Sequence, residues 1–153
     1  MGAIRGVDCR VYMNTAVYAT PTWVEWTCVR DTTLNIEYEE ADATCRGSGG
    51  WRQSAITLAS LEVSGTALKE KSDATFLLIE TAAQAKTVMD LLVMDGVRTS
   101  ADSDGYRLQA QVFSWTENQP MEDVVTIDFS IKPARDANPP AAIAGPQAST
   151  GDA

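Results

Sequence analysis

The sequence predicts a mainly β, α+β fold: an antiparallel β-sandwich or barrel with one flanking helix at about residues 73–85. Apolar and polar residues alternate with a period of two in most segments, which is typical of strands with one buried and one solvated face. Only the segment after Ser72 and Asp73 has apolar residues at helical spacing. The length of 153 residues fits one domain with a single core.

The first half of the chain predicts short strands that lead into a long hairpin. Residues 9–13 fit a short strand at the edge of the sheet, and residues 24–28 hold the next alternating set. Two longer alternating sets follow, which are Leu34, Ile36 and Tyr38 in the first and Ala59, Leu61, Val63, Gly65 and Ala67 in the second. Acidic and glycine-rich residues lie between them, so we expect a long β-hairpin or loop around 32–56. Gly65 within a strand indicates a bulge or a bend.

The helix at about 73–85 begins at a residue that can cap it, which is Ser72 or Asp73. The apolar residues on one face of this helix are Phe76, Ile79, Ala82 and Ala83. The next segment, VMDLLVMDG at 88–96, fits either a continuation of the helix to about residue 94 or a buried strand. Its apolar residues leave no polar helical face, and it ends in an Asp-Gly turn dipeptide, which favours the strand.

A second hairpin is predicted before residue 133. A polar loop at 97–105 precedes a run at 106–117 that is rich in Gln, Val, Phe and Trp. In the segment 124–132, apolar Val125, Ile127, Phe129 and Ile131 alternate with polar Thr126, Asp128 and Ser130. The connection between the two runs contains the turn residues Asn118 and Pro120, so we expect an antiparallel pair.

The composition changes abruptly after residue 133. The segment 134–153 is rich in Pro, Ala and Gly, and Ile143 is its only large apolar residue. We therefore expect a β-sandwich domain at 1–133 and a C-terminal arm at 134–153 that does not fold alone. Two interpretations of the arm stay open. It is a disordered extension, or it crosses onto a neighbouring subunit or ring through residues such as Pro139, Pro140 and Ile143.

Charge and composition exclude several classes of function. With 21 acidic and 12 basic residues the net charge is −9, which argues against binding to nucleic acid or to an anionic membrane surface. The chain has no histidine, and so lacks the commonest general base and metal ligand. No run approaches the ~20 apolar residues of a membrane span, and the N-terminus lacks the apolar region of a secretory signal. We expect no enzyme, no cofactor and no metal site.

The chain has three cysteines, which are Cys9, Cys28 and Cys45. An odd number without CxxC spacing predicts neither a disulfide framework nor a zinc site. We therefore expect them to be small buried apolar residues of a protein in a reducing compartment.

Several short motifs follow one another in a fixed order along residues 5–133. They are Thr22-Trp23, VRDTTL at 29–34, RGSGGW at 46–51, the helix after Asp73, and FSIKP at 129–133. In this order and spacing the chain resembles the tail tube, or major tail, proteins of long-tailed bacteriophages. The segment beyond residue 133 does not belong to the pattern.

The resemblance implies a structural virion protein without catalysis. Its fold would be a β-sandwich or barrel flanked by one helix, and its subunits would pair sheet to sheet in a ring, usually a hexamer, around a channel. Stacked rings would form a tube that carries DNA from the capsid to the cell without binding it specifically. The implied partners are copies of the same chain and other tail proteins, and the implied location is the virion tail, after assembly in the cytoplasm of a bacterial host.

Two groups of residues are candidates for roles in such a tube. The acidic residues Glu37, Glu39, Glu40 and Asp42 either line the channel, where they would repel the DNA backbone, or form a solvated hairpin face that blocks edge pairing. The candidate inter-ring contacts are Arg46, Gly47, Gly49, Gly50 and Trp51. Their glycines permit unusual backbone shapes, and tryptophan is enriched in interface hot spots. The alternative for this loop is an ordinary mobile loop, and it lacks the Gly-Lys-Ser/Thr of a phosphate-binding loop.

Two other functions stay open at this stage. A tail-terminator or head–tail joining protein would form single rings in place of long tubes. A monomeric β-sandwich module that binds carbohydrate would present exposed aromatic residues in a groove and would bind glycans without assembling.

Overall fold

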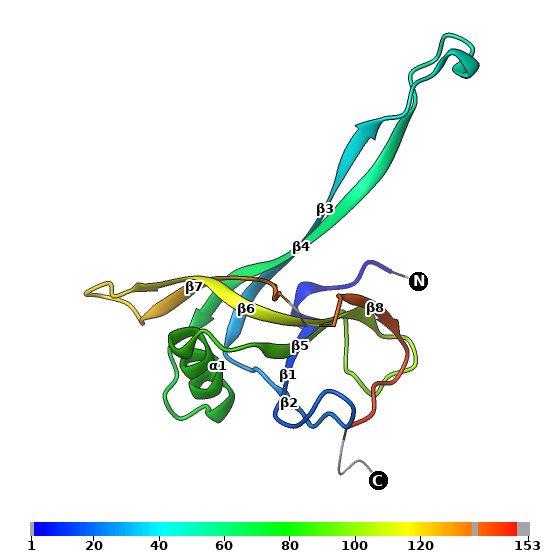
Figure 1. Ribbon diagram of the computed structural model, residues 1–153. Helices are drawn as coiled ribbons and strands as arrows, with labels where there is room; N and C mark the ends of the chain where they lie inside the picture. Colours follow the sequence, from blue (N-terminus) through cyan, green and yellow to red (C-terminus); the bar gives the residue numbers. More distant parts are fainter. Residues whose placement is uncertain (1, 136–137, 150–153) are drawn as a thin grey trace.

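In the part of the chain that the computed structural model describes, residues 2–135 and 138–149, eight strands form one antiparallel sheet (Figure 1). The strands are β1 (Arg10–Asn14), β2 (Trp23–Glu25), β3 (Val29–Asp42), β4 (Ser54–Leu68), β5 (Met89–Met94), β6 (Asp104–Asn118), β7 (Thr126–Pro133) and β8 (Ala141–Ala144). Their order is β2-β1-β5-β6-β7-β4-β3, and β8 pairs with the beginning of β6. The helices are α1 (Ala74–Ala85) and two short 3-10 turns, Gly6–Asp8 and Arg46–Ser48.

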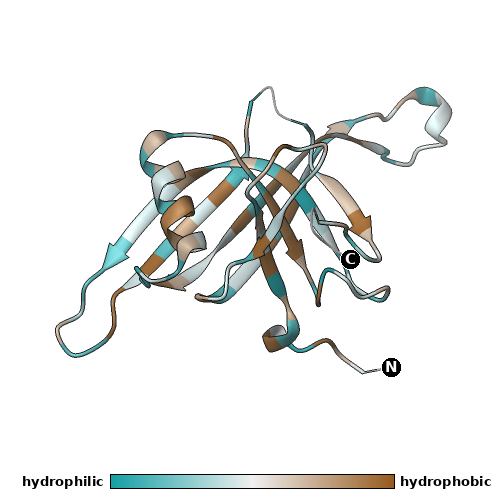
Figure 2. Ribbon diagram, turned by 90° about the horizontal axis from the view of Figure 1, so that it is seen from below, coloured by the Kyte–Doolittle hydropathy of each residue, from teal (hydrophilic) through white to brown (hydrophobic). Residues whose placement is uncertain are grey.

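The sheet curves around an apolar inner face, and α1 packs against this face (Figure 2). The buried side chains from the strands include Val63, Leu91, Leu108, Ile127, Phe129 and Ile131. The helix contributes Phe76, Ile79 and Ala82, with the Phe76 ring 6.1 Å from that of Trp115. The predicted fold class, mainly β with one flanking helix, is confirmed.

A smaller apolar cluster lies on the opposite face of the sheet. It consists of Tyr12, Trp23, Leu92 and Met94, with Ile143 packed against it. On β5, Leu91 therefore points to one cluster and Leu92 to the other, and both side chains are fully buried. A strand buried on both faces reads as a continuous apolar run, which explains why 88–96 looked ambiguous between helix and strand. The favoured interpretation, a strand, is confirmed.

The helix begins where the sequence predicts. Asp73 is the N-cap, and its carboxylate accepts a hydrogen bond of 3.0 Å from the backbone N–H of Thr75. The helix ends at Ala85, and its C-cap residue Lys86 adopts a left-handed conformation with φ of 60°. Since this conformation ends the hydrogen-bonding pattern of the helix, the chain turns directly into β5.

The prediction that residues 9–13 form an edge strand is wrong. β1 pairs with β2 on one side and with β5 on the other. The reason is the loop at 15–22, which turns the chain back so that Trp23–Glu25 lies beside β1 and becomes the edge. A sequence pattern reports which face of a strand is buried, but it carries no information on how many neighbours pair with that strand.

The predicted long hairpin is formed by β3 and β4, which pair from Val29 and Ala67 to Asp42 and Ser54. Its outer half projects far from the body of the protein (Figure 1). The pairing shifts register between Val29 and Asp31 and again between Tyr38 and Glu40. Gly65 itself pairs in register with Thr32 and with Phe129, so the irregularity near this glycine lies on the neighbouring strand β3 and not at Gly65.

The C-terminal arm lies against its own chain. β8 pairs with Asp104–Arg107, and farther along the N–H of Gln147 donates to the carbonyl of Arg98 at 2.7 Å. The hydroxyl of Ser149 accepts from the N–H of Trp23 at 2.9 Å. Residues 136–137 and 150–153 of the predicted arm lie outside the described residues. Contact of the arm with a neighbouring subunit stays a prediction.

Gly105 has no space for a side chain. A Cβ atom there would lie 2.0 Å from the carbonyl oxygen of Val93 on β5. Because backbone must move to admit a methyl group, Gly105→Ala should lower the free energy of unfolding by about 1–3 kcal/mol. Urea denaturation measures this loss. The matched control is Gly6→Ala, where no atom lies within 4 Å of the added Cβ, and an equal loss in both variants would contradict the prediction.

Candidate functional site

The outer half of the β3–β4 hairpin exposes large apolar side chains. Tyr38, Ile56 and Leu58 are 60%, 71% and 65% exposed. A ribbon of two strands is a single layer, and nothing in the described part of the chain packs on it to cover such residues. Isolated two-stranded hairpins are marginally stable in water. Exposed apolar surface of this kind indicates contact with another protein surface.

The four acidic candidates all lie on β3, but they do not share one face. Side chains alternate along a strand, so Glu37 and Glu39 point to one side of the ribbon and Glu40 and Asp42 to the other. The strand pairing agrees with this alternation. Glu37 shares one face of the ribbon with its partner Ser60, whereas Glu40 shares the other face with its partner, the apolar Ile56. At most two of the four can therefore face a common channel, and such a role stays a prediction.

The face that carries Glu37 continues over the sheet as a polar surface opposite to α1. Glu62 on β4 belongs to it and accepts a hydrogen bond of 2.6 Å from the hydroxyl of Ser130. Asp128 on β7 accepts from Thr66 and from Asn118, both at 2.9 Å. The acidic face thus comprises Glu37, Glu39, Glu62 and Asp128. Sequence reasoning missed Glu62 and Asp128 as site residues, although Asp128 already stood on the polar side of an alternating strand.

The tip of the hairpin, defined here as residues 43–53, is a loop with a defined hydrogen-bond pattern. The hydroxyl of Ser48 accepts from the N–H of Cys45 and donates to the side chain of Gln53, both at 3.0 Å. Gly49 and Gly50 have φ of 65° and 85°, a conformation that other residues rarely adopt. The predicted contact residues Arg46, Gly47, Gly49, Gly50 and Trp51 are thus brought together at the most distant point of the ribbon, and all are exposed.

Of the four tryptophans, all within the described residues, Trp51 alone is exposed, at 78%. Trp26 packs in the main core, as expected, while Trp23 lies in the smaller cluster and Trp115 lies beside the helix. Of the predicted contacts in the arm, Pro139 and Pro140 are exposed next to β8, whereas Ile143 is half-buried against its own chain.

The prediction that the cysteines are buried is wrong for two of them. Cys9 and Cys45 are exposed and Cys28 is half-buried, and all three are free thiols. Cys45 opens the turn at the hairpin tip, where hydrogen bonds from the side chain of Ser48 and then the backbone of Gly47 lower the pKa of its thiol. Burial, followed by the side chain of Asp73, raises the pKa of Cys28. Cys45 is therefore the more reactive of these two thiols at neutral pH.

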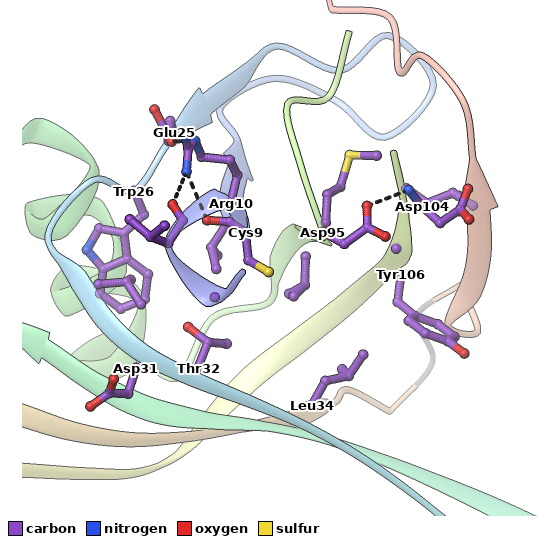
Figure 3. A pocket seen from close by; sticks show the side chains of 18 of the residues that line it. Cys9, Arg10, Glu25, Trp26, Asp31, Thr32, Leu34, Asp95, Asp104 and Tyr106 are labelled. Carbon is purple, nitrogen blue, oxygen red and sulfur yellow. Dashed lines mark hydrogen bonds and ion pairs between the residues drawn. The ribbon is translucent and has the colours of Figure 1, made fainter. Parts of the chain in front are cut away.

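An open cleft of about 1290 Å³ lies at the mouth of the curved sheet (Figure 3). Its walls come from the N-terminal segment, β1, the start of β3, the end of β5, the start of β6, and β8. Arg10 pairs with Glu25 at 2.9 Å, and the carboxylate of Asp95 accepts from the N–H of Asp104 at 2.8 Å. No sequence pattern indicates this cleft, because its walls are distant from one another in the chain.

Beside the smaller cluster, a buried ion pair joins β5 and β6. Arg107 donates to Asp90 at 2.6 Å and to the carbonyl of Tyr18 at 2.7 Å. Its guanidinium lies 3.7 Å from the centre of the Tyr18 ring. Asn14 also donates to Asp90, at 3.0 Å. These contacts fix the loop at 15–22, and the sequence did not predict them.

No group of three or more potential metal ligands of the Cys, Asp or Glu type occurs within residues 2–135 and 138–149. In the same described part of the chain, the single α-helix is neither long nor apolar enough to span a membrane.

Comparison with protein families gives a match that covers most of the chain. The model of the family described as phage tail tube protein matches residues 3–134. No curated protein matches the sequence.

Comparison with solved structures gives matches over nearly the whole chain. The tail tube of SPP1 aligns with a TM-score of 0.73 at 16% identity, over 95% of this chain and 81% of that chain. The tail of an empty gene transfer agent particle, refined with C6 symmetry, aligns with a TM-score of 0.70 at 15% identity, over 89% and 98% of the two chains. A sheath–tube complex of an extracellular contractile injection system aligns with a TM-score of 0.61 at 10% identity, over 93% and 92%. At these identities the likeness establishes the fold.

Proposed function

The chain belongs to the phage tail tube protein family, and from this premise we propose that its copies close into six-membered rings that stack into a DNA-conducting tube. The protein is a structural component of the virion tail. Its further partners are the other proteins of the tail, and assembly takes place in the cytoplasm of the bacterial host. The function is mechanical and involves no catalysis.

Ring closure is supported by the free edges of the sheet. Within the described residues, the outer edge of β3 (Val29–Asp42) pairs with no other strand. At the other end the short β2 is likewise unpaired on its outer side. A long free edge is a template for further pairing, and identical copies arranged about an axis satisfy such edges by closure. Six copies would agree with the C6 symmetry of the gene transfer agent tail, which has the same fold.

The distribution of charge on the sheet supports an assignment of the face that lines the channel. The acidic face, with Glu37, Glu39, Glu62 and Asp128, is the face that α1 does not cover. We place this face toward the channel and α1 on the outside of the tube. Negative side chains would repel the phosphate backbone, so that DNA slides past without specific binding.

Stacking is supported by the projecting hairpin. Its exposed apolar stem and its tip extend beyond the body, so they can reach the next ring (Figure 1). The contact residues at the tip are Arg46, Gly47, Gly49, Gly50 and Trp51. Residues of the arm, Pro139, Pro140 and Ile143, add contacts to a neighbouring subunit or ring in this proposal. A contact between two different surfaces repeats without end, as the growth of a tube requires.

The observation that carries the proposal is the family match, and electron microscopy tests it directly. Purified protein at high concentration and physiological salt should form long tubes with a central channel, and a sizing column should show species far larger than one chain. Single rings that never stack would point to a tail-terminator or joining protein. Persistent monomers, above all monomers that bind glycans, would overturn the proposal.

A further inference from the structure

We propose that the cleft at the mouth of the sheet receives the hairpin tip of a second copy of this chain. The inference rests on the proposed stacking of rings and adds the receiving surface to it. The tip is residues 43–53, and the cleft is formed by the N-terminal segment together with β1, β3, β5, β6 and β8.

The size and lining of the cleft suit a protein loop. Its volume of about 1290 Å³ exceeds the ~300–1,000 Å³ of common small-molecule pockets. Apolar side chains on its walls include Val11, Trp26, Leu34, Val93 and Tyr106. Trp51 at the tip is a large apolar side chain that is 78% exposed in the single chain. A tryptophan that enters an apolar pocket is a frequent anchor of protein interfaces.

The charges of the two surfaces are complementary. The chain has a net charge of −9, yet the tip contains Arg46 and Arg52 and no acidic residue. The cleft is lined by the acidic residues Glu25, Asp31, Asp95 and Asp104 and by the basic residues Arg10 and Arg30. Arg10 is already paired with Glu25. Among the described residues Asp95 and Asp104 have no cationic partner, so they are available to the arginines of an entering tip.

The occupant must be another copy. The ribbon that carries the tip is paired along its length and points away from the body, so the tip does not reach the cleft of its own chain (Figure 1). Tip and cleft are different surfaces, and docking of one into the other therefore joins copies head to tail. Such a contact leaves a free tip at one end of each stack and a free cleft at the other.

Docking would bring two native thiols near each other. Cys9 lines the cleft, and its side chain points into the opening in Figure 3. Cys45 opens the turn at the tip. Cys9 of one subunit and Cys45 of the next thus report on the contact without any engineered residue.

Crosslinking within assembled tubes tests the docking. Tubes of the Cys28→Ala variant, treated with a short bismaleimide, should give a ladder of multimers under denaturing conditions, joined through Cys9 and Cys45 in peptide mass mapping. Cys9→Ser or Cys45→Ser, each in the same background, should abolish the ladder. Tubes that form but show no Cys9–Cys45 crosslink would overturn the docking alone. Failure to form tubes at all would instead overturn the proposed function.

Charge reversal supplies a second, independent readout. Arg46→Glu with Arg52→Glu should raise the critical concentration for tube growth about tenfold or more, since both arginines would then face carboxylates. Adding Asp104→Arg should recover part of the loss. The matched control, Lys71→Glu with Lys132→Glu, makes the same change of charge outside the tip and the cleft. An equal effect in the control, or no effect of the tip variant, would contradict the docking.

Discussion

Replacement of Asp90 by alanine should lower the free energy of unfolding by about 3–5 kcal/mol, because it leaves the charge of Arg107 buried without its partner. Asp90 is 8% exposed, and the side chain of Arg107 is 16% exposed. The carboxylate also accepts a hydrogen bond from Asn14, which the variant loses as well. Chemical denaturation followed by tryptophan fluorescence measures the loss, since Trp23 lies beside the pair.

The matched control is Glu25→Ala, which breaks the more exposed pair with Arg10. That side-chain pair is 33% and 37% exposed, so its loss should cost at most about 1 kcal/mol. A variant in which Asp90→Leu and Arg107→Met are combined should regain much of the stability, because no unpaired charge remains. Similar losses for Asp90→Ala and Glu25→Ala would show that burial does not set the strength of the Arg107 pair.

Removal of the hairpin tip should abolish tube growth and leave the subunit folded. Asp42 and Ser54 face each other as the last pair of the ribbon, so an Asn-Gly turn can connect them directly in place of residues 43–53. The substitution removes Arg46, Trp51 and Arg52 without touching the core. Electron microscopy should show no long tubes, and circular dichroism should show an unchanged melting temperature.

The control is the same replacement at the end of the other exposed hairpin, which β6 and β7 form. Asn118 and Thr126 are paired, and an Asn-Gly turn can replace residues 119–125 between them. This variant should still form tubes. Tubes of normal length from the variant without the tip would refute the role of the tip in stacking, whatever the control shows.

The fold was largely predictable from local patterns. The alternation in 124–132 predicted β7 because one face of that strand is buried and the other is solvated. Asp73 predicted the start of α1 because an N-cap acts within one turn. The position of β1 inside the sheet was not predictable, since it depends on a loop that brings Trp23–Glu25 beside it. The exposure of Cys9 and Cys45 was missed because the composition predicts buried cysteines in general. Both residues lie in connections beside strands, and neither lies on a buried face.

The candidate site was predictable only where it is local. The residues at 46–51 follow one another in sequence, so the tip loop was visible before the fold was known. The acidic face was not, because Glu62 and Asp128 reach it through the pairing of different strands. Sequence adjacency also grouped Glu37 with Glu40, which alternation separates. The cleft and the Asp90–Arg107 pair join distant segments, and no spacing rule indicates them.

The slender outer half of the β3–β4 hairpin has a mechanical consequence for a stack of rings. Two strands without a packed layer behind them yield to bending far more readily than the thick body of the subunit. Rings joined through these two-stranded hairpins can tilt against one another while each ring keeps its shape. A filament built in this way curves under load at its joints, and its bore stays open along the bend.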